Sequence, residues 1–493
     1  MTNLWYISHN CGGLGWTSLS KMELDEIISD HHFETPIDHC NKLAQVTIFI
    51  GVLCSVILSV SQCSGDLIMA LLSLVLWLMF NPTWATAPSA LEEYKLNQIP
   101  TTITGTLSRF NLHNSTTVYV ACPTCSCLYK LVFWSSSPTP EYPAHRTNKP
   151  KPWLPVCGQS LLWSTSNGQT SPIRPFVYHH FHDFVASLLS RWEINAIIDN
   201  PCDKLMKSHH NPPLVNAKDI WDSKFLRTFH GPLPSALFVD RMGEGHLAFS
   251  LNVDFFNVED VWVRGETTSC SVITCACLNL PLEICYKPEN MYLAGIIPGL
   301  HEPHGNKLNH FLDPLIEGMV ESWEQGIHFN HTALHPSGQV VRSAIACMVC
   351  DFSAVWKTVQ MSGPRSYFYC SVCSCCDLKT LGRTDFDSEC WKLWDKDVLW
   401  QQVEAYKNAD SAQLQDKLFA KQGVHWLPLW KLLYWDPAWQ LVVDVMHCIL
   451  EGITTFYIHD VLCLTTVKAD AWEITPLTSL TQAAFQGQQM TIL

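Results

Sequence analysis

Short apolar runs and amphipathic stretches alternate in the middle of this 493-residue chain. The runs Phe249–Asn257 and Ala344–Asp351 are apolar and partly β-branched, which is typical of buried strands in a covered sheet. Between them, residues 312–323 place apolar side chains at helical spacing, with acidic side chains on the opposite face. The pattern predicts an α/β unit over residues 224–382.

The remaining segments carry weaker or different patterns. Residues 172–199 show helical spacing of apolar side chains from Phe176 to Trp192, and these aromatic residues are expected in the core. Residues 86–118 are polar and linker-like, and residues 391–421 indicate charged amphipathic helices inserted after the α/β unit. The predicted organisation is a polar segment (1–43), an apolar helical hairpin (44–84), a Cys-rich module (119–162), a helical connector (172–223), the α/β core (224–382), a helical insertion (383–464) and an unmatched tail (465–493).

Two apolar runs, residues 44–62 and 67–84, contain no charge and are each about long enough to cross a bilayer. They predict either a transmembrane helical pair or a buried helical hairpin. An intron translated in a faulty gene model is a third interpretation. The flanking sequence does not discriminate, because Lys42 is the single nearby positive charge and an aromatic belt is not evident at both ends.

The composition indicates whether the chain folds, whether it can bind nucleic acid over a wide surface, and what its cysteines do. An apolar fraction of 47% and 20 tryptophans predict a folded chain of two or three domains. The net charge of −14 argues against an extended nucleic-acid interface, because phosphate neutralisation needs a basic face. The 22 cysteines are clustered, and residues 1–41 do not have the pattern of a secretory leader. Metal binding is therefore expected for these cysteines rather than disulfides.

Asp254 and Asp351 each stand where an apolar strand-like run ends. Carboxylate oxygens are ligands that Mg²⁺ prefers, and a pair of such ions can hold the attacking and leaving oxygens of a phosphodiester. On neighbouring strands, the two aspartates would face a common cleft. The alternative is that each aspartate caps the element that follows it.

The Cys-rich module contains Cys122, Cys125 and the distant Cys157, with Cys127 nearby. A Cys-x-x-Cys pair followed by another cysteine is typical of a zinc ribbon, in which thiolates bind Zn²⁺ tetrahedrally. His145 is placed to serve as the fourth ligand, while Arg146 stands where a cysteine is expected. Buried thiols without a metal are the alternative.

A second set of metal-ligand types follows the α/β unit. Cys370 and Cys373 form another Cys-x-x-Cys pair, and Asp444 and His447 lie one helical turn apart. Together they predict a closed, structural Zn²⁺ site. Buried thiols and a helix-packed histidine are the alternative.

The segments that carry these residues resemble the transposase of CACTA-type (En/Spm-like) DNA transposons, closest to the copies in mushroom-forming fungi. The resemblance covers roughly residues 119–464 in collinear order. It rests on Asn252–Asn257, Leu278–Pro281, Pro288–Gly299, Leu308–Leu312, Ala344–Asp351, Cys370–Cys373 and Asp444–Gly452.

The resemblance implies a ribonuclease-H-like core with a Mg²⁺-binding triad of two aspartates and a further acid, to which Asp254 and Asp351 correspond. It assigns Cys370, Cys373 and His447, with Asp444 assisting, to a zinc-associated signature, although Asp444 itself is the alternative third acid. It also implies transposon-end DNA with terminal inverted repeats as the partner, self-association and a nuclear location. A membrane protein anchored by residues 44–84 is the competing interpretation.

The end of the chain departs from the family pattern, since the family continues beyond the Asp-x-x-His segment and supplies its third carboxylate there. Glu473 is followed by Pro476 within one turn, and Glu451 lies close to the zinc signature. We therefore expect a truncated or degenerate copy that does not cut DNA. A non-catalytic relic or domesticated DNA-associated protein is the related alternative.

Overall fold

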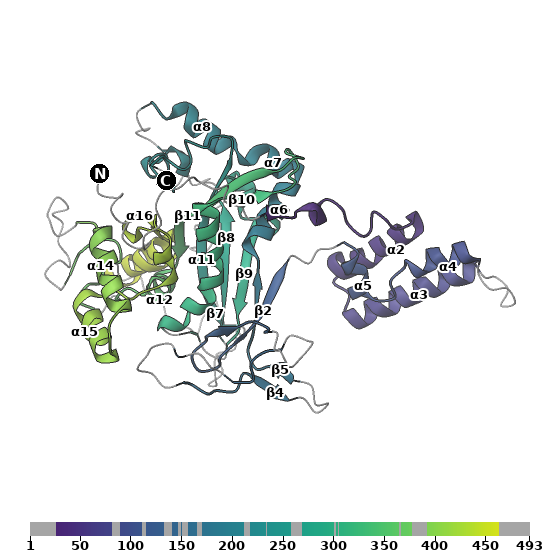
Figure 1. The fold of residues 1–493 in the computed structure, drawn as a ribbon, viewed down its shortest axis with the longest axis horizontal. Helices are drawn as coiled ribbons and strands as arrows, with labels where there is room; N and C mark the ends of the chain where they lie inside the picture. Colours follow the sequence, from purple (N-terminus) through teal and green to yellow (C-terminus); the bar gives the residue numbers. More distant parts are fainter. Residues whose placement is uncertain are drawn as a thin grey trace, which may run out of the picture.

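The computed structural model describes residues 26–80, 89–110, 115–132, 141–145, 149, 156–164, 170–211, 217–232, 234–257, 269–299, 302–303, 305–363, 366–376 and 392–462. In these residues the fold is mixed α/β, with a large mixed sheet and helices packed around it (Figure 1). The mixed α/β class predicted from the sequence is thereby confirmed.

The main sheet contains ten strands in the order β1-β10-β11-β7-β8-β9-β6-β2-β3, and β12 pairs with β11 beside this path. The strands are β1 (Glu26–Ile27), β2 (Thr116–Ala121), β3 (Leu128–Tyr129), β6 (Pro175–His179), β7 (Gly245–Asn257), β8 (Ser269–Cys277), β9 (Met291–Ile297), β10 (Ile327–Phe329), β11 (Gln339–Cys350) and β12 (Leu441–Val443). A separate hairpin pairs β4 (Leu162–Ser164) with β5 (Thr170–Pro172).

Five strands form the centre of the sheet, in the order β9-β8-β7-β11-β12. β7, β8 and β9 are antiparallel neighbours, whereas β11 runs parallel to β7 and β12 runs parallel to β11. Phe249, Leu251 and Val253 of β7 are buried. A strand that is apolar along its length is expected where both sheet faces are covered, so the predicted buried strands are confirmed at β7 and β11.

Helix α11 (Asn309–Glu324) packs against β11, between β9 and β11 in the chain. Leu312, Leu315, Ile316 and Met319 are fully buried on its inner face, so the predicted apolar helix face is confirmed. On the outer face, Asp313 Oδ1 lies 2.7 Å from Lys431 Nζ, and this ion pair connects the helix to the later insertion. α11 therefore links the sheet to the C-terminal part of the chain.

The other helices of the core and the insertion are α6 (Phe181–Ser190), α7 (Trp192–Ile198), α8 (Asn200–Ser208), α9 (Lys224–Arg227), α10 (Leu282–Cys285), α12 (Phe352–Val359), α14 (Lys396–Lys407), α15 (Ala412–Gln422) and α16 (Pro437–Gln440). The amphipathic helices predicted for residues 391–421 correspond to α14 and α15. The insertion therefore separates α12 from β12.

The sequence pattern of residues 172–199 was misleading. Pro175–His179 form strand β6, and Phe176 is buried on that strand rather than on a helix. Helices α6 and α7 follow it, and Trp192 at the start of α7 is 64% exposed. Five residues with a strand pattern were too short to separate from the helical pattern that follows.

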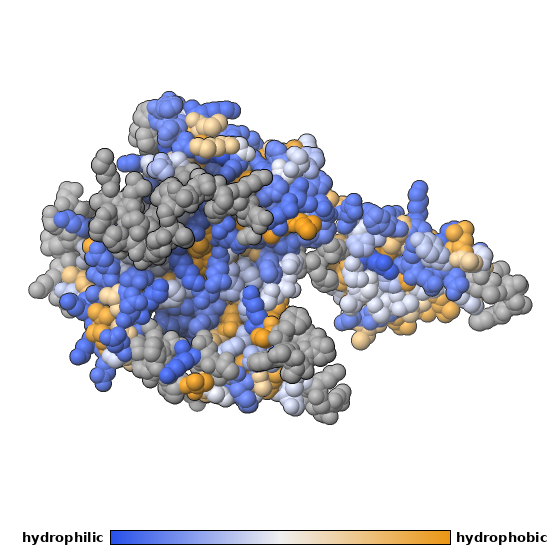
Figure 2. Space-filling view, in the orientation of Figure 1, coloured by the Kyte–Doolittle hydropathy of each residue, from blue (hydrophilic) through white to orange (hydrophobic). Residues whose placement is uncertain are grey.

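An arm of four α-helices extends from the core on the right of Figure 1: α2 (Lys42–Val52), α3 (Gln62–Phe80), α4 (Ala90–Asn97) and α5 (Ile103–Ser108). The interpretation of residues 86–118 as a linker is wrong, because Ser89 and Glu92 form a capping box that begins α4. By length and composition α3 alone among the described helices could cross a membrane, and most of it is exposed. Figure 2 shows apolar residues along one edge of the arm.

Asn279, in the turn after β8, is a buried polar anchor for the sheet. Its Oδ1 accepts from Ala248 N at 2.8 Å, and its Nδ2 donates to the carbonyls of His246 and Ile198 at 2.9 and 3.0 Å. Asn279→Ala is expected to lower the free energy of unfolding by about 2–4 kcal/mol, because three buried backbone groups lose their partner. Urea unfolding measures this, with the exposed Asn408→Ala as control; equal losses in both variants would contradict the assignment.

Candidate active site and metal centres

Three aspartates stand at equivalent distances along three parallel strands: Asp254 lies within β7, and Asp351 and Asp444 directly follow β11 and β12. Met348 of β11 is paired with Leu251 of β7 and with Leu441 of β12. Three positions further along these strands stand the three carboxylates: Asp254, Asp351 and Asp444. Because neighbours in register on parallel strands point to the same face, these side chains emerge side by side on one face of the sheet. We refer to them as the aspartate row.

A β-bulge at Ala346 sets this register. Ile345 pairs with Phe249, but the next pair is Cys347 with Ser250, so β11 contains one extra residue. A shift of one residue turns every later side chain to the opposite face. Without the bulge, Asp351 would therefore lie on the face opposite Asp254. The bulge is what places both carboxylates on the same face.

The insertion supplies the hydrogen bonds that the bulge needs. Tyr434 Oη accepts from Ile345 N at 2.9 Å, and Gln440 Nε2 donates to Ile345 O at 2.8 Å. Both side chains are buried. Since an unpaired buried backbone group costs about 1–3 kcal/mol, these contacts stabilise the bulged conformation.

Each aspartate also makes a local backbone contact through Oδ1. Asp351 accepts from Ala354 N at 2.6 Å and caps α12, so the capping interpretation is confirmed for this residue. Asp254 accepts from Phe255 N, and Asp444 accepts from Met446 N, both at 2.8 Å. In these side-chain conformations, the three aspartates do not bring one carboxylate oxygen each to within 4.8 Å of the other two. A shared ion would require rotation of these side chains.

The Cys350 thiol lies close enough to the aspartate row for all three carboxylates to affect its pKa. Its Sγ accepts from Val253 N at 3.3 Å, between β7 and β11. Burial first, and then the charges of Asp351, Asp254 and Asp444, raise the pKa of the Cys350 thiol to about 12. All three carboxylates therefore act on one buried point, and a divalent cation beside them would relieve their mutual repulsion.

His447 is paired with the aspartate row. Its Nδ1 lies 2.5 Å from Asp444 Oδ2, and this contact raises the pKa of His447. Glu451, one turn further on the helical stretch Met446–Thr454, is exposed. The predicted alternative acid Glu473 lies outside the described residues.

The residues of the predicted second zinc site make local contacts within each half of the site. Cys373 Sγ lies 3.2 Å from Cys375 Sγ, and Cys373 N donates to Cys370 Sγ at 3.4 Å. Asp444 and His447 contact each other as described above. In the described part of the chain, the cysteine pair and the Asp-His pair do not come together as one group of ligand atoms within 4.8 Å. A shared zinc ion for these four residues stays a prediction.

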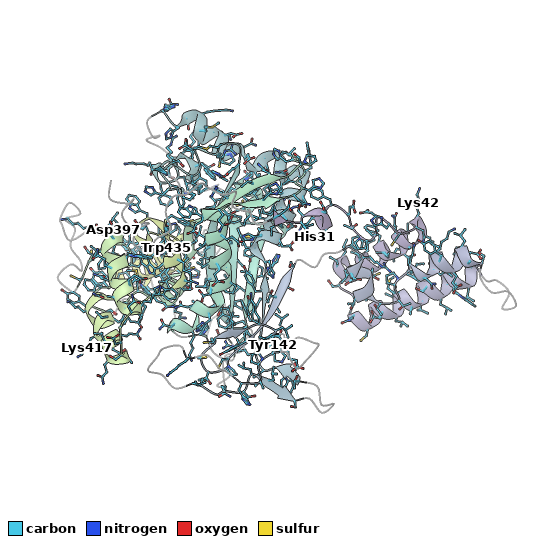
Figure 3. The ribbon with its side chains drawn as sticks, viewed as in Figure 1. His31, Lys42, Tyr142, Asp397, Lys417 and Trp435 are labelled. Carbon is cyan, nitrogen blue, oxygen red and sulfur yellow. The ribbon has the colours of Figure 1, made fainter. Side chains whose placement is uncertain are left out.

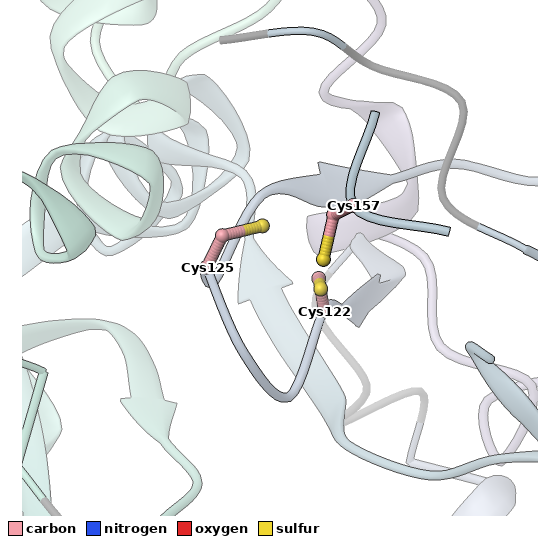
Figure 4. A group of neighbouring side chains, drawn as sticks. All are labelled: Cys122, Cys125 and Cys157. Carbon is pink, nitrogen blue, oxygen red and sulfur yellow. The ribbon is translucent and has the colours of Figure 1, made fainter. Parts of the chain in front are cut away.

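Cys122, Cys125 and Cys157 converge as the Cys-rich pattern predicts (Figure 4). Their sulfur atoms all lie within 4.8 Å of one another. The turn is formed by Ser126 with a φ of 63° and by the Cys122 N to Cys127 O hydrogen bond of 2.9 Å. Burial raises the pKa of the Cys122 thiol to about 11 without a cation, and a bound Zn²⁺ would favour the thiolate.

The nearest further ligand types beside this cluster are residues that the sequence pattern did not select. His145, the expected ligand, is exposed and is not in the group, and Arg146 lies outside the described residues. Instead, Cys125 contacts Cys127, whose Sγ lies 3.3 Å from His310 Nε2. His310 belongs to the first turn of α11, 183 residues after Cys127, so spacing alone could not pair them.

Residues 246–392 match the family model described as "Transposase family tnp2". The matched segment contains Asp254, Asp351, Cys370 and Cys373 and ends before Asp444. A comparison with curated proteins gives no match.

Proposed function

We propose that this chain is a transposase of the CACTA (En/Spm-like) type, as found in mushroom-forming fungi, and that the aspartate row is its catalytic metal site. The single observation that carries the proposal is the pairing of Met348 with Leu251 and Leu441, each of which stands three positions before one of the aspartates Asp351, Asp254 and Asp444. The match of residues 246–392 to a transposase family supports it independently.

A ribonuclease-H-like core is part of this proposal. Support comes from the central strand order, in which an antiparallel meander (β9, β8, β7) is followed by two parallel strands (β11, β12). The first and second aspartates then lie on adjacent strands, as two-metal chemistry requires. α11 lies between the meander and β11 in the chain and packs against β11.

The residues of the row would hold Mg²⁺ through hard carboxylate oxygens. Bound ions would lower the pKa of the attacking water and stabilise charge on the leaving oxygen. Asp254 and Asp351 would supply carboxylate ligands to these ions. Asp444 closes the row, and its pairing with His447 orients it. The expected reaction is hydrolysis of a phosphodiester at the transposon end, followed by attack of the freed 3′-hydroxyl on target DNA.

Asp444 changes the expectation that the chain is inactive. That expectation placed the third acid beyond Leu493, whereas the register supplies a third carboxylate within the described residues. We therefore propose Asp444 as the third metal-binding carboxylate of the site. In the relic interpretation, which is the alternative, the protein binds DNA without cutting it.

The test is cleavage of a labelled duplex that carries the terminal inverted repeat of the encoding transposon, with Mg²⁺ or Mn²⁺. Metal-dependent release of 3′-hydroxyl ends that is lost in Asp254→Asn, Asp351→Asn and Asp444→Asn supports the proposal. Repeat-specific binding without cutting in the unmodified chain would establish the relic instead.

Zinc has a structural role in this proposal. Cys122, Cys125 and Cys157 would bind Zn²⁺ with Cys127 or His310 as the fourth ligand, which would fix the Cys-rich module to α11. Transposon-end DNA, self-association on paired ends and a nuclear location complete the proposed function. DNA contacts must be local, because the net charge is −14.

Membrane attachment is a second candidate, favoured by the exposed apolar side chains of the arm. Leu67, Leu71 and Val75 of α3 are 60%, 51% and 52% exposed. They recur at helical spacing, as on a helix that contacts lipid or another protein. Flotation of the full chain with neutral lipid vesicles tests this. Flotation that disappears in Leu71→Glu/Val75→Glu would establish attachment, and no flotation of the unmodified chain would exclude it.

A further inference from the structure

A second cluster of metal-ligand types lies at the base of the helical arm. His31 and His32 are on a short 3₁₀ turn, and Asp183 is on α6. The Nε2 atoms of His31 and His32 lie 2.9 and 3.0 Å from the same oxygen, Asp183 Oδ1. The ligand atoms of the three residues lie within 4.8 Å of one another. Figure 3 shows His31 at the junction between the core and the arm, which carries Lys42.

The hydrogen bonds of His31 orient its ring as in a metal ligand. His31 Nδ1 lies 3.1 Å from the carbonyl oxygen of Ile28. Because a carbonyl only accepts, Nδ1 donates to Ile28 O, and Nε2 is the ring nitrogen that faces the carboxylate. Metal-binding histidines commonly donate their other ring N–H to such a carbonyl.

Asp183 is held in place from its other side. Ser115 N donates to Asp183 Oδ2 at 2.6 Å, and the side chain is only 7% exposed. Oδ1 therefore stays directed at the two rings. The ligand atoms need to separate only slightly, since the edge of a tetrahedral zinc site is about 3.3 Å for bonds of about 2.0 Å. His31 is 39% exposed, so a fourth position can be filled by water.

We propose that His31, His32 and Asp183 bind one divalent transition-metal ion of the zinc class, which fastens the arm to the core. The chain enters the arm after His32 and returns to the core at Ser115, and Asp183 contacts both segments. The entering segment also contacts residues 328–331 of the core: Glu26 Oε1 lies 3.3 Å from His328 Nδ1, and the Phe33 ring stacks on the His331 ring. β1 has two residues, and Ser29 adds hydrogen bonds to Asn330. A metal at this point would add to these contacts and further limit movement of the arm relative to the core.

The test compares the zinc content of full-length proteins after dialysis against buffered Zn²⁺. His31→Ala/His32→Ala is expected to bind one zinc fewer than the unmodified chain, with an affinity at this site at least about 100-fold lower. The control is His209→Ala/His210→Ala, which removes an adjacent histidine pair that is exposed. Equal zinc content in the unmodified chain and in both variants would overturn the proposal.

Two further measurements keep this site distinct from the cysteine cluster. Co²⁺ bound by thiolates gives sulfur charge-transfer absorption, so the double-histidine variant should keep that absorption while losing one equivalent of cobalt. Zn²⁺ should slow proteolysis near residues 34–41 in the unmodified chain and not in the double variant. The same rate with and without Zn²⁺ in the unmodified chain would contradict the proposed fastening, and loss of the thiolate absorption in the variant would contradict a separate site.

Discussion

Asp444→Asn is expected to reduce metal-dependent cleavage of terminal-repeat DNA at least about 1000-fold, because a preorganised ligand for transition-state charge is lost. Asn keeps the size of the side chain and its backbone contact with Met446. It removes the negative charge that completes the row. Asp254→Asn and Asp351→Asn should have comparable effects, and combining two substitutions should add little further loss, since the three residues act as one unit.

Asp410→Asn is the matched control, because Asp410 is an exposed aspartate of the insertion that lies outside the row. It should cleave like the unmodified chain. Normal cleavage by Asp444→Asn, with loss in Asp254→Asn and Asp351→Asn, would show that the third acid is another residue. Glu451→Gln would then be the next variant, because Glu451 lies on the helical stretch after Asp444.

Cys122→Ser is expected to remove one zinc equivalent and to destabilise the Cys-rich module. A serine hydroxyl is a poor Zn²⁺ ligand, and binding of a structural zinc contributes directly to folding, by about 10–16 kcal/mol in isolated zinc-finger peptides. Zinc content and thermal unfolding measure the effect. Because thiols must lose protons to bind zinc, affinity in the unmodified chain should rise with pH through neutrality.

Cys63→Ser is the control for this experiment, since Cys63 is exposed on α3 and far along the chain from the cluster. His310→Ala and Cys127→Ser then identify the fourth ligand. The variant with the lower zinc affinity identifies the residue that supplies the fourth ligand. Unchanged zinc content in Cys122→Ser, Cys125→Ser and Cys157→Ser would contradict the site altogether.

Local pattern was sufficient to predict the long elements of the core. The inner face of α11 could be predicted because Leu312, Leu315 and Met319 recur at the helical period over about two turns. The strands β7 and β11 were readable as apolar runs. β6 was hidden because five residues carry too little periodicity, and a helix follows almost at once.

The candidate site was predictable only where its residues are close in sequence. Cys122 and Cys125 share one turn, and the distant Cys157 was found from its residue type. The role proposed for Asp444 depends on the register between β11 and β12, and the pairing of Cys127 with His310 depends on how α11 packs. Register and packing are set by tertiary contacts, so neither could be derived from spacing.

The β-bulge at Ala346 also constrains the order in which the site can be completed. Its side-chain partners, Tyr434 and Gln440, follow Ile345 by 89 and 95 residues, and the three-residue strand β12 follows them. A chain emerging from the ribosome contains Asp254 and Asp351 long before these residues exist. During synthesis the proposed nuclease site therefore lacks both its third carboxylate and the contacts that hold its register. If the proposed function holds, cleavage competence would begin only after the segment that contains Tyr434, Gln440 and Asp444 has been translated and folded.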